Sequence, residues 1–311
     1  MSIELTAYDI SGTLLALPTP IAYEMYSGDL GVVTTFSFKF LQSIPKEVVR
    51  LDVKKENGDI ISCFVDSIQR VLDENGDNYT LNVTNDRAKV MQNQVKPTKH
   101  LVYDTSNMLE DYAKPYGITK SNLVSGTASI FETTIGMTAW DAITLFCRKV
   151  FGGYATLMQD GTLSLNNFVS TSIVFGEGGL PYTYLKQKDD RTVLPSRVYM
   201  QAYDDDSDFS AYMDNEYAIN CGISRVRYYR SPKQWSILTK RGASEIIRNA
   251  NLKRYTYEIK VPQYLDLYPG MVVKIKGLGI DETTYYVDKT YFSKTQKGQF
   301  TRVVLCNYLM I

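Results

Sequence analysis

Hydrophobic and polar positions alternate in short runs over the first ~95 residues, and turn residues separate these runs. A period of two is typical of strands that bury one face. Two segments are hairpin signals. Asn57-Gly58-Asp59 connects the runs 47–54 and 60–65, and the segment 74–77 connects the runs 67–73 and 79–84. The pattern predicts a small antiparallel barrel or sandwich in which successive strands form a meander. The predicted strands are residues 32–40, 47–54, 60–65, 67–73 and 79–84.

The polar stretch 88–100 ends this alternation, the period changes from Asp104, and a clear helical period follows residue 138. Thr138 is expected to cap a helix, and Asp141, three residues later, completes a capping box. Gly152 and Gly153 are expected to end the helix. The apolar residues that recur at helical spacing on its predicted inner face are Trp140, Ile143, Cys147 and Val150.

A hairpin is expected directly after this helix. Asp160-Gly161 supplies the positive backbone dihedrals of a tight turn, between predicted strands 154–158 and 162–165. A shorter helix around residues 108–113 precedes both elements and is stopped by Pro115 and Gly117. Residues 101 to about 175 are therefore expected to form a small α/β module, which the flexible segment 176–179 ends.

The C-terminal part combines strand alternation with one long helix. Residues 185–203 and 223–229 alternate again, and Ser231-Pro232 with Gln234 is a strong helix start. A helix of roughly 18 residues is expected to follow, to about Asn251. The predicted strands after it are residues 255–261, 271–275, 284–291 and 299–308, with a Pro269-Gly270 turn before the second.

Composition places the chain among ordinary globular proteins. Its 311 residues are 44% hydrophobic, which suffices for more than one core, and its net charge of zero gives no general attraction to nucleic acid or anionic membranes. The first 17 residues lack the pattern of a secretory signal, and no apolar run reaches the roughly 18 residues of a membrane helix. The chain is therefore expected to be made and kept in a cytoplasm. Its cysteines are far apart and are expected to be buried free thiols: Cys63, Cys147, Cys221 and Cys306.

Catalytic and metal chemistry find little support in the residue pattern. His100 is the only histidine, and no nucleophile stands in a recognisable elbow near it. Two carboxylates placed for glycoside hydrolysis cannot be identified from spacing, because Asp and Glu lie mostly in turns and polar loops. We expect no enzyme activity, no catalytic residue, no cofactor and no metal site.

The acidic segment 204–208 has the alternate aspartates of a calcium loop. Phe209 stands where such a loop needs glycine, and Asn215 occupies the position of the final glutamate, so a solvated loop is the favoured interpretation. A basic stretch with interleaved tyrosines follows, from Arg225 to Arg254. Without a nucleic-acid-binding motif this stretch is expected to form a solvated face, or to pair with the acidic loop of a neighbouring subunit.

The Thr-x-Trp-Asp helix start and the Asp-Gly hairpin resemble the middle region of phage tail hub proteins, the family that includes late control protein D. The long helix, the Pro-Gly turn and the last three strands resemble the closing barrel of the same proteins. The residues that carry this resemblance, and that we expect to have structural roles, are Trp140, Asp141, Gly161, Pro269 and Gly270.

The resemblance implies a β-dominated α+β fold with two antiparallel β-barrel-like tube domains and a small α/β module between them. The expected domains are residues 1–100 for the first barrel, 101–180 for the module, and 181–311 for the second barrel with its helix. It implies a homotrimeric baseplate hub, whose pseudo-sixfold ring joins a sixfold tail tube to a threefold central spike. The 24 tyrosines, twice the number of phenylalanines, suit contacts between such subunits.

The implied partners are the tail tube protein, the central spike protein, the tape measure protein in the lumen and the baseplate wedge proteins, without a membrane or a specific nucleic acid. The implied location is the baseplate of a virion or tail particle that assembles in a bacterial cytoplasm. Phage, bacteriocin and other injection machines all remain open as the host particle. Two alternatives are kept: a glycan-binding or glycan-cleaving tail component, and a sixfold tube or distal-tail subunit.

Overall fold

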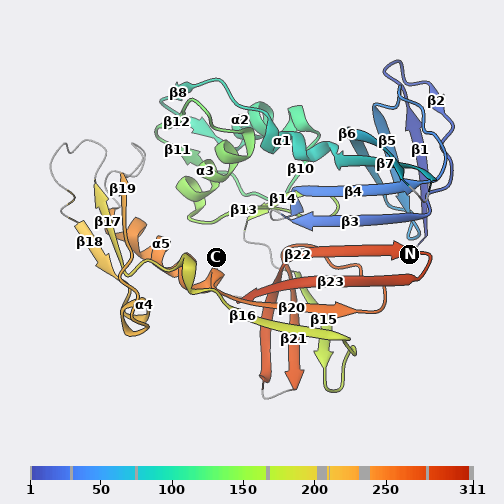
Figure 1. Ribbon diagram of the computed structural model, residues 1–311. Helices are drawn as coiled ribbons and strands as arrows, with labels where there is room; N and C mark the ends of the chain where they lie inside the picture. Colours follow the sequence, from blue (N-terminus) through green and yellow to red (C-terminus); the bar gives the residue numbers. More distant parts are fainter. Residues whose placement is uncertain are drawn as a thin grey trace. The chain divides into compact units, whose positions relative to one another are not determined.

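The computed structural model describes residues 2–28, 31–73, 76–165, 169–201, 209, 211–230, 239–277 and 280–307. The chain divides into two compact units. Unit 1 comprises Met1–Tyr184 and Ile259–Val304, and unit 2 comprises Leu185–Glu258 and Leu305–Ile311. Strands dominate the described chain as a whole, which confirms the expected β-rich α+β class (Figure 1).

The N-terminal strands of unit 1 lie in the order β3-β4-β7-β6-β5-β1-β2. The predicted meander is therefore correct for β5, β6 and β7 but wrong for β4, which lies beside β7. The register explains this, because buried Phe36 and Phe38 of β4 lie opposite buried Val83 and Leu81 of β7. The strands are β1 (Ile3–Tyr8), β2 (Leu14–Leu15), β3 (Ala22–Gly28), β4 (Val33–Phe40), β5 (Arg50–Lys55), β6 (Ile60–Asp73) and β7 (Gly76–Asn85).

The two strands predicted at residues 60–65 and 67–73 are one strand, β6. An irregularity in its pairing with β7 lies between Val65 and Ser67. Such a bulge shifts the alternation by one residue, so the sequence pattern looks interrupted although the strand continues.

The last strands of the chain join this N-terminal sheet. β22 pairs antiparallel with β3, with Phe292 opposite Met25, and Figure 1 shows the two strands side by side. The N-terminal and C-terminal strands thus form one large, mainly antiparallel sheet rather than closed barrels, with β15 and β21 as a parallel pair. The strands are β15 (Val169–Gly176), β20 (Tyr255–Val261), β21 (Met271–Gly277), β22 (Ile280–Thr295) and β23 (Gly298–Asn307).

The expected division into domains 1–100, 101–180 and 181–311 stays a prediction. Unit 1 contains the whole of the first two ranges together with the C-terminal strands.

The small α/β module lies within unit 1 and has its own aromatic core. The Tyr103 ring stacks on Phe131 at 4.7 Å, and both rings meet the edge of Phe146 on the central helix α3. The predicted helix around residue 110 is present as three short helical turns that end at Gly117 (φ 77°). The elements are η2 (Asp86–Ala88), α1 (Lys89–Gln92), β8 (Thr98–His100), β9 (Tyr103–Asp104), α2 (Thr105–Met108), η3 (Leu109–Ala113), η4 (Lys114–Tyr116), β10 (Lys120–Ser121), β11 (Thr127–Ala128), β12 (Phe131–Thr133), α3 (Ala139–Phe151), β13 (Ala155–Leu157) and β14 (Thr162–Leu165).

Unit 2 holds a three-stranded sheet in the order β18-β17-β19. Val198 and Met200 of β17 pack with Ala243 and Ile247 of helix α5, so one face of this sheet is covered. The predicted start of the long helix at Ser231 and the acidic segment 204–208 lie outside the described residues. The elements are β16 (Tyr184–Asp189), η5 (Arg191–Val193), β17 (Arg197–Gln201), β18 (Ala211–Asp214), α4 (Glu216–Asn220), β19 (Val226–Arg230) and α5 (Thr239–Lys253).

The cysteines are free, as expected, and three of them are buried: Cys63, Cys147 and Cys306. Cys221 is partly exposed. No helix in the described part of the chain is both long and apolar enough to cross a membrane.

Candidate functional site

The start of helix α3 has the predicted capping box. The Thr138 hydroxyl accepts a hydrogen bond from the Asp141 amide (3.1 Å), and the Asp141 carboxylate accepts one from the Thr138 amide (2.9 Å). Trp140 is buried in the module core, and Gly152 ends the helix at φ 70°. These residues fix the helix locally and take no part in the cleft described below.

The hairpin between β13 and β14 closes onto Arg87. The Arg87 guanidinium donates to the Gln159 carbonyl at 3.1 Å and to the Asp160 carbonyl at 3.3 Å. Gly161 has φ 85°, and a Cβ at this position would lie 2.4 Å from Arg87 Cζ. The positive backbone dihedral therefore favours glycine here, and a side chain at this position would also displace the Arg87 guanidinium.

The Asp160 side chain stabilises the same turn. Its carboxylate accepts hydrogen bonds from the Thr162 amide (3.0 Å) and the Thr162 hydroxyl (2.8 Å). The hydrogen bond from the Thr162 amide is the main cause of a lowered Asp160 pKa, and the charge of Arg87 adds to it. The carboxylate therefore stays ionised over the neutral range.

Buried Asn85 fixes the end of β7, two residues before Arg87. The Asn85 amide oxygen accepts from the Thr34 amide at 3.0 Å, and its NH₂ group donates to the Val32 carbonyl at 2.9 Å. Because both ends of this buried side chain are satisfied, the chain leaves β7 in a fixed direction. Arg87 follows two residues later.

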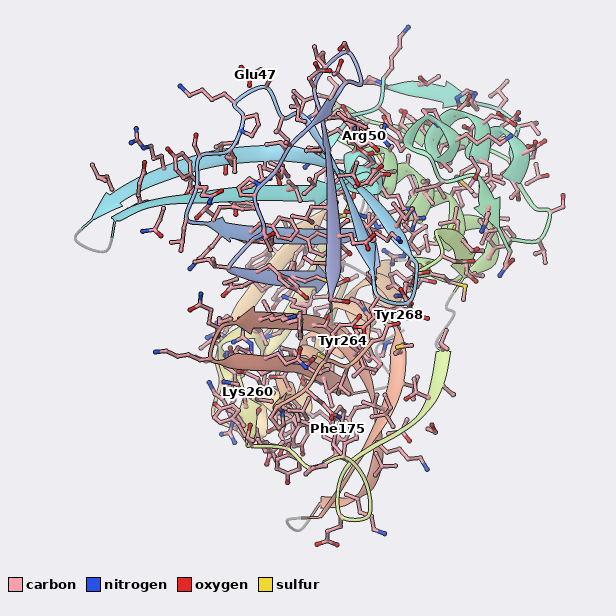
Figure 2. All side chains as sticks on the ribbon, turned by 90° about the vertical axis from the view of Figure 1, so that its right-hand side faces the viewer. Glu47, Arg50, Phe175, Lys260, Tyr264 and Tyr268 are labelled. Atoms are coloured by element: carbon pink, nitrogen blue, oxygen red, sulfur yellow. The ribbon has the colours of Figure 1, made fainter. Side chains whose placement is uncertain are left out.

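Asp266 connects three segments of unit 1. Its carboxylate accepts hydrogen bonds from the Gln159 amide (3.2 Å) and the Tyr264 hydroxyl (2.9 Å), and it lies 3.6 Å from the Lys55 ammonium. Figure 2 shows Tyr264 and Tyr268 on this segment between β20 and β21. Burial, and then the charge of Asp266, raise the pKa of the Tyr264 hydroxyl, so it remains a donor.

The Pro269-Gly270 turn follows this segment directly. Both residues are buried, Gly270 has φ 91°, and its amide donates to the Val287 carbonyl at 2.9 Å. The turn thus leads from Asp266 into β21, as expected for a turn that precedes a strand.

A cavity of about 600 Å³ opens between the end of the N-terminal sheet and the module. One wall comes from β5, β6, the end of β7 and η2, and the other from the end of η4 and the β13–β14 turn. Its lining is mostly polar or charged and consists of Lys55, Asp59, Ile60, Ile61, Ser62, Asn85, Asp86, Arg87, Tyr116, Gly117, Gln159 and Asp160. A smaller adjoining cavity reaches Asp266 and Tyr268.

A row of tyrosines crosses the sheet of unit 2 on the face opposite α5. Tyr199 lies opposite both Tyr212 and Tyr228, with ring centroids 5.6 Å and 4.9 Å apart. Tyr212 is 52% exposed and Tyr228 61% exposed. Beside the row, Arg197 forms a bidentate pair with Asp214 (2.5 and 2.9 Å). Exposed tyrosine with arginine is the composition of protein–protein interfaces.

The structure brings together some of the residues singled out by sequence. Gly161 contacts Arg87, and Pro269 and Gly270 follow the segment that carries Asp266, which bonds to Gln159. Trp140 and Asp141 lie at the start of α3, away from this cluster. Nothing in these contacts tests the family-specific roles expected for the five residues.

Sequence reasoning missed Lys55, Arg87 and Asp266. A signal for Lys55 was present, because it follows Leu51 and Val53 at the same phase of the β5 alternation, and all three are buried. A lysine at an inward position of a strand indicates a buried charge that needs a partner. Arg87 and Asp266 gave no such signal, since both lie outside strands.

His100 lies in β8, and its ring packs on Tyr103 at 4.5 Å. The described residues contain no group of three or more His, Cys, Asp or Glu side chains placed to hold a metal ion.

Solved structures with the same fold include tail proteins of bacterial and prophage origin. The chain matches the tail protein from Neisseria meningitidis MC58 over 99% of its length and 97% of that chain, with TM-score 0.70 and 13% identity. It matches the prophage MuSo2 43 kDa tail protein from Shewanella oneidensis over 97% of both chains, with TM-score 0.72 and 14% identity.

A third match is the E. coli c3393 protein, described as a type VI secretion component similar in structure to T4 tail proteins gp27 and gp5. It has TM-score 0.56 and 7% identity over 98% of this chain and 76% of that chain. No family model and no curated protein sequence matches this chain. At these identities the similarity shows a shared fold, which is that of phage tail and related secretion components.

Proposed function

We propose that this chain is the structural baseplate hub of a contractile tail or related injection particle. Three copies form a pseudo-sixfold ring that joins the sixfold tail tube to the threefold central spike and surrounds the lumen. The observation that carries the proposal is the fold match to two tail proteins over 97% or more of each chain.

The continuous sheet of unit 1 offers a physical basis for this role. An adaptor between sixfold and threefold partners needs six similar faces on one side and three on the other. The N-terminal strands and the C-terminal strands form two groups that meet at the β3–β22 pair. Because each subunit has two such strand groups, three subunits supply the six similar faces that a sixfold tube requires.

The partners follow from this position. The ring contacts the tail tube protein on one side and the central spike protein on the other, the baseplate wedge proteins lie around it, and the tape measure protein passes through the lumen. The role is mechanical rather than enzymatic, and the location is the tail particle. A sixfold tube or distal-tail subunit is the rival role for the same fold.

Cryo-electron microscopy of the assembled tail end tests the proposal directly. Three copies between tube and spike are expected. Six copies would transfer the chain to a tube-type role, and absence from the tail axis would contradict a role as hub.

The tyrosine row of unit 2 is proposed as one contact between subunits. Replacing exposed Tyr228 by serine removes its stacking on Tyr199 and reduces the trimer fraction in solution, measured by light scattering. Tyr184, which is 43% exposed on β16, provides the matched control. Equal trimer fractions for Tyr228→Ser and Tyr184→Ser would contradict this assignment.

A further inference from the structure

The cleft of unit 1 contains a buried cation whose hydrogen-bonding capacity is not filled. The Lys55 side chain is 7% exposed and lines both adjoining cavities. Asp266 lies 3.6 Å from its ammonium, beyond ordinary hydrogen-bond distance, and the described residues provide no hydrogen bond to this group. An ammonium has three N–H donors, so it presents donors to whatever fills the cleft.

The charges of the lining disfavour an anionic ligand. Asp59, Asp86 and Asp160 outnumber Lys55 and Arg87 around the larger cavity. The carboxylates each accept a hydrogen bond from the chain itself, Asp59 from Asn57 (2.8 Å) and Asp86 from Lys89 (2.6 Å), and keep further lone pairs for a hydroxyl donor. A small metal cation needs several ligands at one point, and the described residues contain no group of three or more His, Cys, Asp or Glu side chains placed to hold one.

Hydroxyl groups suit this lining better than either ion. A hydroxyl donates one hydrogen bond and accepts two, so it can accept from Lys55 while donating to a carboxylate such as Asp59. Several hydroxyls on a rigid ring can use donors and acceptors that come from different segments. The uncharged ring also avoids the cost of burying an unpaired charge.

The remaining wall and the size of the cleft fit a sugar. The half-buried Tyr116 side chain and Ile60, which is 62% exposed, provide apolar surface for the C–H groups of a sugar ring. The volume of about 600 Å³ falls within the range of small-molecule pockets, about 300–1,000 Å³.

We propose that this cleft, at the end of β5 between the sheet and the module, binds a neutral saccharide unit of a glycan, with Lys55 as its central hydrogen-bond donor. The binding is separate from the proposed role as hub and needs only unit 1. It would give a tail component a means of contacting envelope glycans without cleaving them.

Binding of neutral sugars to the purified full chain tests the proposal. Glucose, maltose and N-acetylglucosamine are titrated by saturation-transfer NMR and calorimetry, with glucuronate and glucosamine as charged probes. At least one neutral sugar is expected to bind more tightly than both charged probes. No binding of any neutral sugar, or preference for glucuronate or glucosamine, would overturn the proposal.

Lys55→Met locates the binding in the cleft, because it removes the ammonium and keeps most of the apolar stem. The affinity for the bound sugar is expected to fall about tenfold. Lys54→Met is the matched control, since Lys54 is the preceding residue of the same strand and its exposed side chain pairs with Glu4. Equal affinities of the two variants would refute the assignment to this cleft.

A second variant covers the case in which Lys55→Met fails to fold, as judged by circular dichroism. Asp59→Asn changes an exposed side chain at the turn between β5 and β6 and is expected to lower the affinity severalfold. An unchanged affinity in this folded variant would count against the proposal. Copy number in the tail particle is measured independently, so the failure of one proposal is distinguishable from the failure of the other.

Discussion

At the scale of single residues, Gly161 determines how closely the β13–β14 turn approaches the sheet. Its positive φ is the backbone dihedral that the tight hairpin turn needs. The missing side chain leaves room for the Arg87 guanidinium. Arg87 in turn uses its donors on the Gln159 and Asp160 carbonyls. The sequence predicted the first requirement from the Asp-Gly pair. The second depends on an arginine more than 70 positions away.

Gly161→Ala should therefore destabilise the protein more than a glycine substitution in open space. We expect the free energy of unfolding to fall by about 2–4 kcal/mol. The added methyl group would strain the backbone at a positive φ, and it would also displace the Arg87 guanidinium from its two carbonyl acceptors. Gly12→Ala is the control, since Gly12 has φ 83° with no atom within 4 Å of the added Cβ. It should cost about 1–2 kcal/mol. Urea denaturation of both variants gives the comparison, and equal losses would contradict the role of Arg87.

Buried tyrosines should make the protein sensitive to alkaline pH. Burial raises the pKa of Tyr23, which is 5% exposed, to about 12. Its folded pKa lies above the unfolded value, so the stabilising contribution is complete below about pH 10 and is lost as the pH rises to about 12. We expect a loss on the order of 2 kcal/mol from this group, measured by denaturation at successive pH values.

Tyr23→Phe should weaken this alkaline dependence, because phenylalanine cannot ionise. Tyr228→Phe provides the control, as Tyr228 is 61% exposed. The explanation would be wrong if Tyr23→Phe kept the pH profile of the unmodified chain.

At the scale of elements, local sequence signals predicted helix α3 and its hairpin well. Three local signals define them: the capping box at Thr138, the glycine end at Gly152 and the Asp160-Gly161 turn. Each signal depends only on residues within four positions of its own site. Strand alternation likewise located β4, β5, β20 and β21. It did not locate the strands before Val32 or the bulge in β6, where the two-residue period is shifted.

Thr138→Ala should lower the free energy of unfolding by about 1 kcal/mol, because the Asp141 amide loses its acceptor. Thermal denaturation followed by circular dichroism at the helix wavelength measures the loss. Thr134→Ala, at an exposed position before the helix, should change stability by less than about 0.5 kcal/mol. A loss of the same size in both variants would show that the cap contributes nothing.

At the scale of the whole molecule, unit 1 is built from two distant parts of the sequence. The chain leaves unit 1 after Tyr184 and returns at Ile259. The Thr183 amide donates to the Lys260 carbonyl at 2.8 Å, so the exit and the return lie next to each other. The larger part of unit 2, Leu185–Glu258, is therefore an insertion between two neighbouring strand positions, and Leu305–Ile311 completes the unit.

Replacing residues 185–258 by a short Asn-Gly-containing linker should leave unit 1 folded. Met1–Tyr184 and Ile259–Val304 form one compact unit, and a hairpin turn can join the adjacent ends. One cooperative unfolding transition is expected by calorimetry. The control removes residues 259–311 instead, which deprives β3 of its partner β22 and should give an aggregating chain. A soluble, cooperative C-terminal deletion would contradict this interpretation of the sheet.

The amino-acid pattern alone predicted the strand-rich class, the capped helix, the tight turns and the inward phase of strands such as β4 and β5, because these depend on dihedral preferences and hydrogen bonds within a few residues. Tertiary structure decided that β4 lies beside β7 and β22 beside β3. It also decided that Lys55, Arg87 and Asp266 surround one cleft. Strand partners are chosen by matching buried faces across long stretches of chain, and many pairings satisfy the same alternation, so only packing of the whole core selects among them.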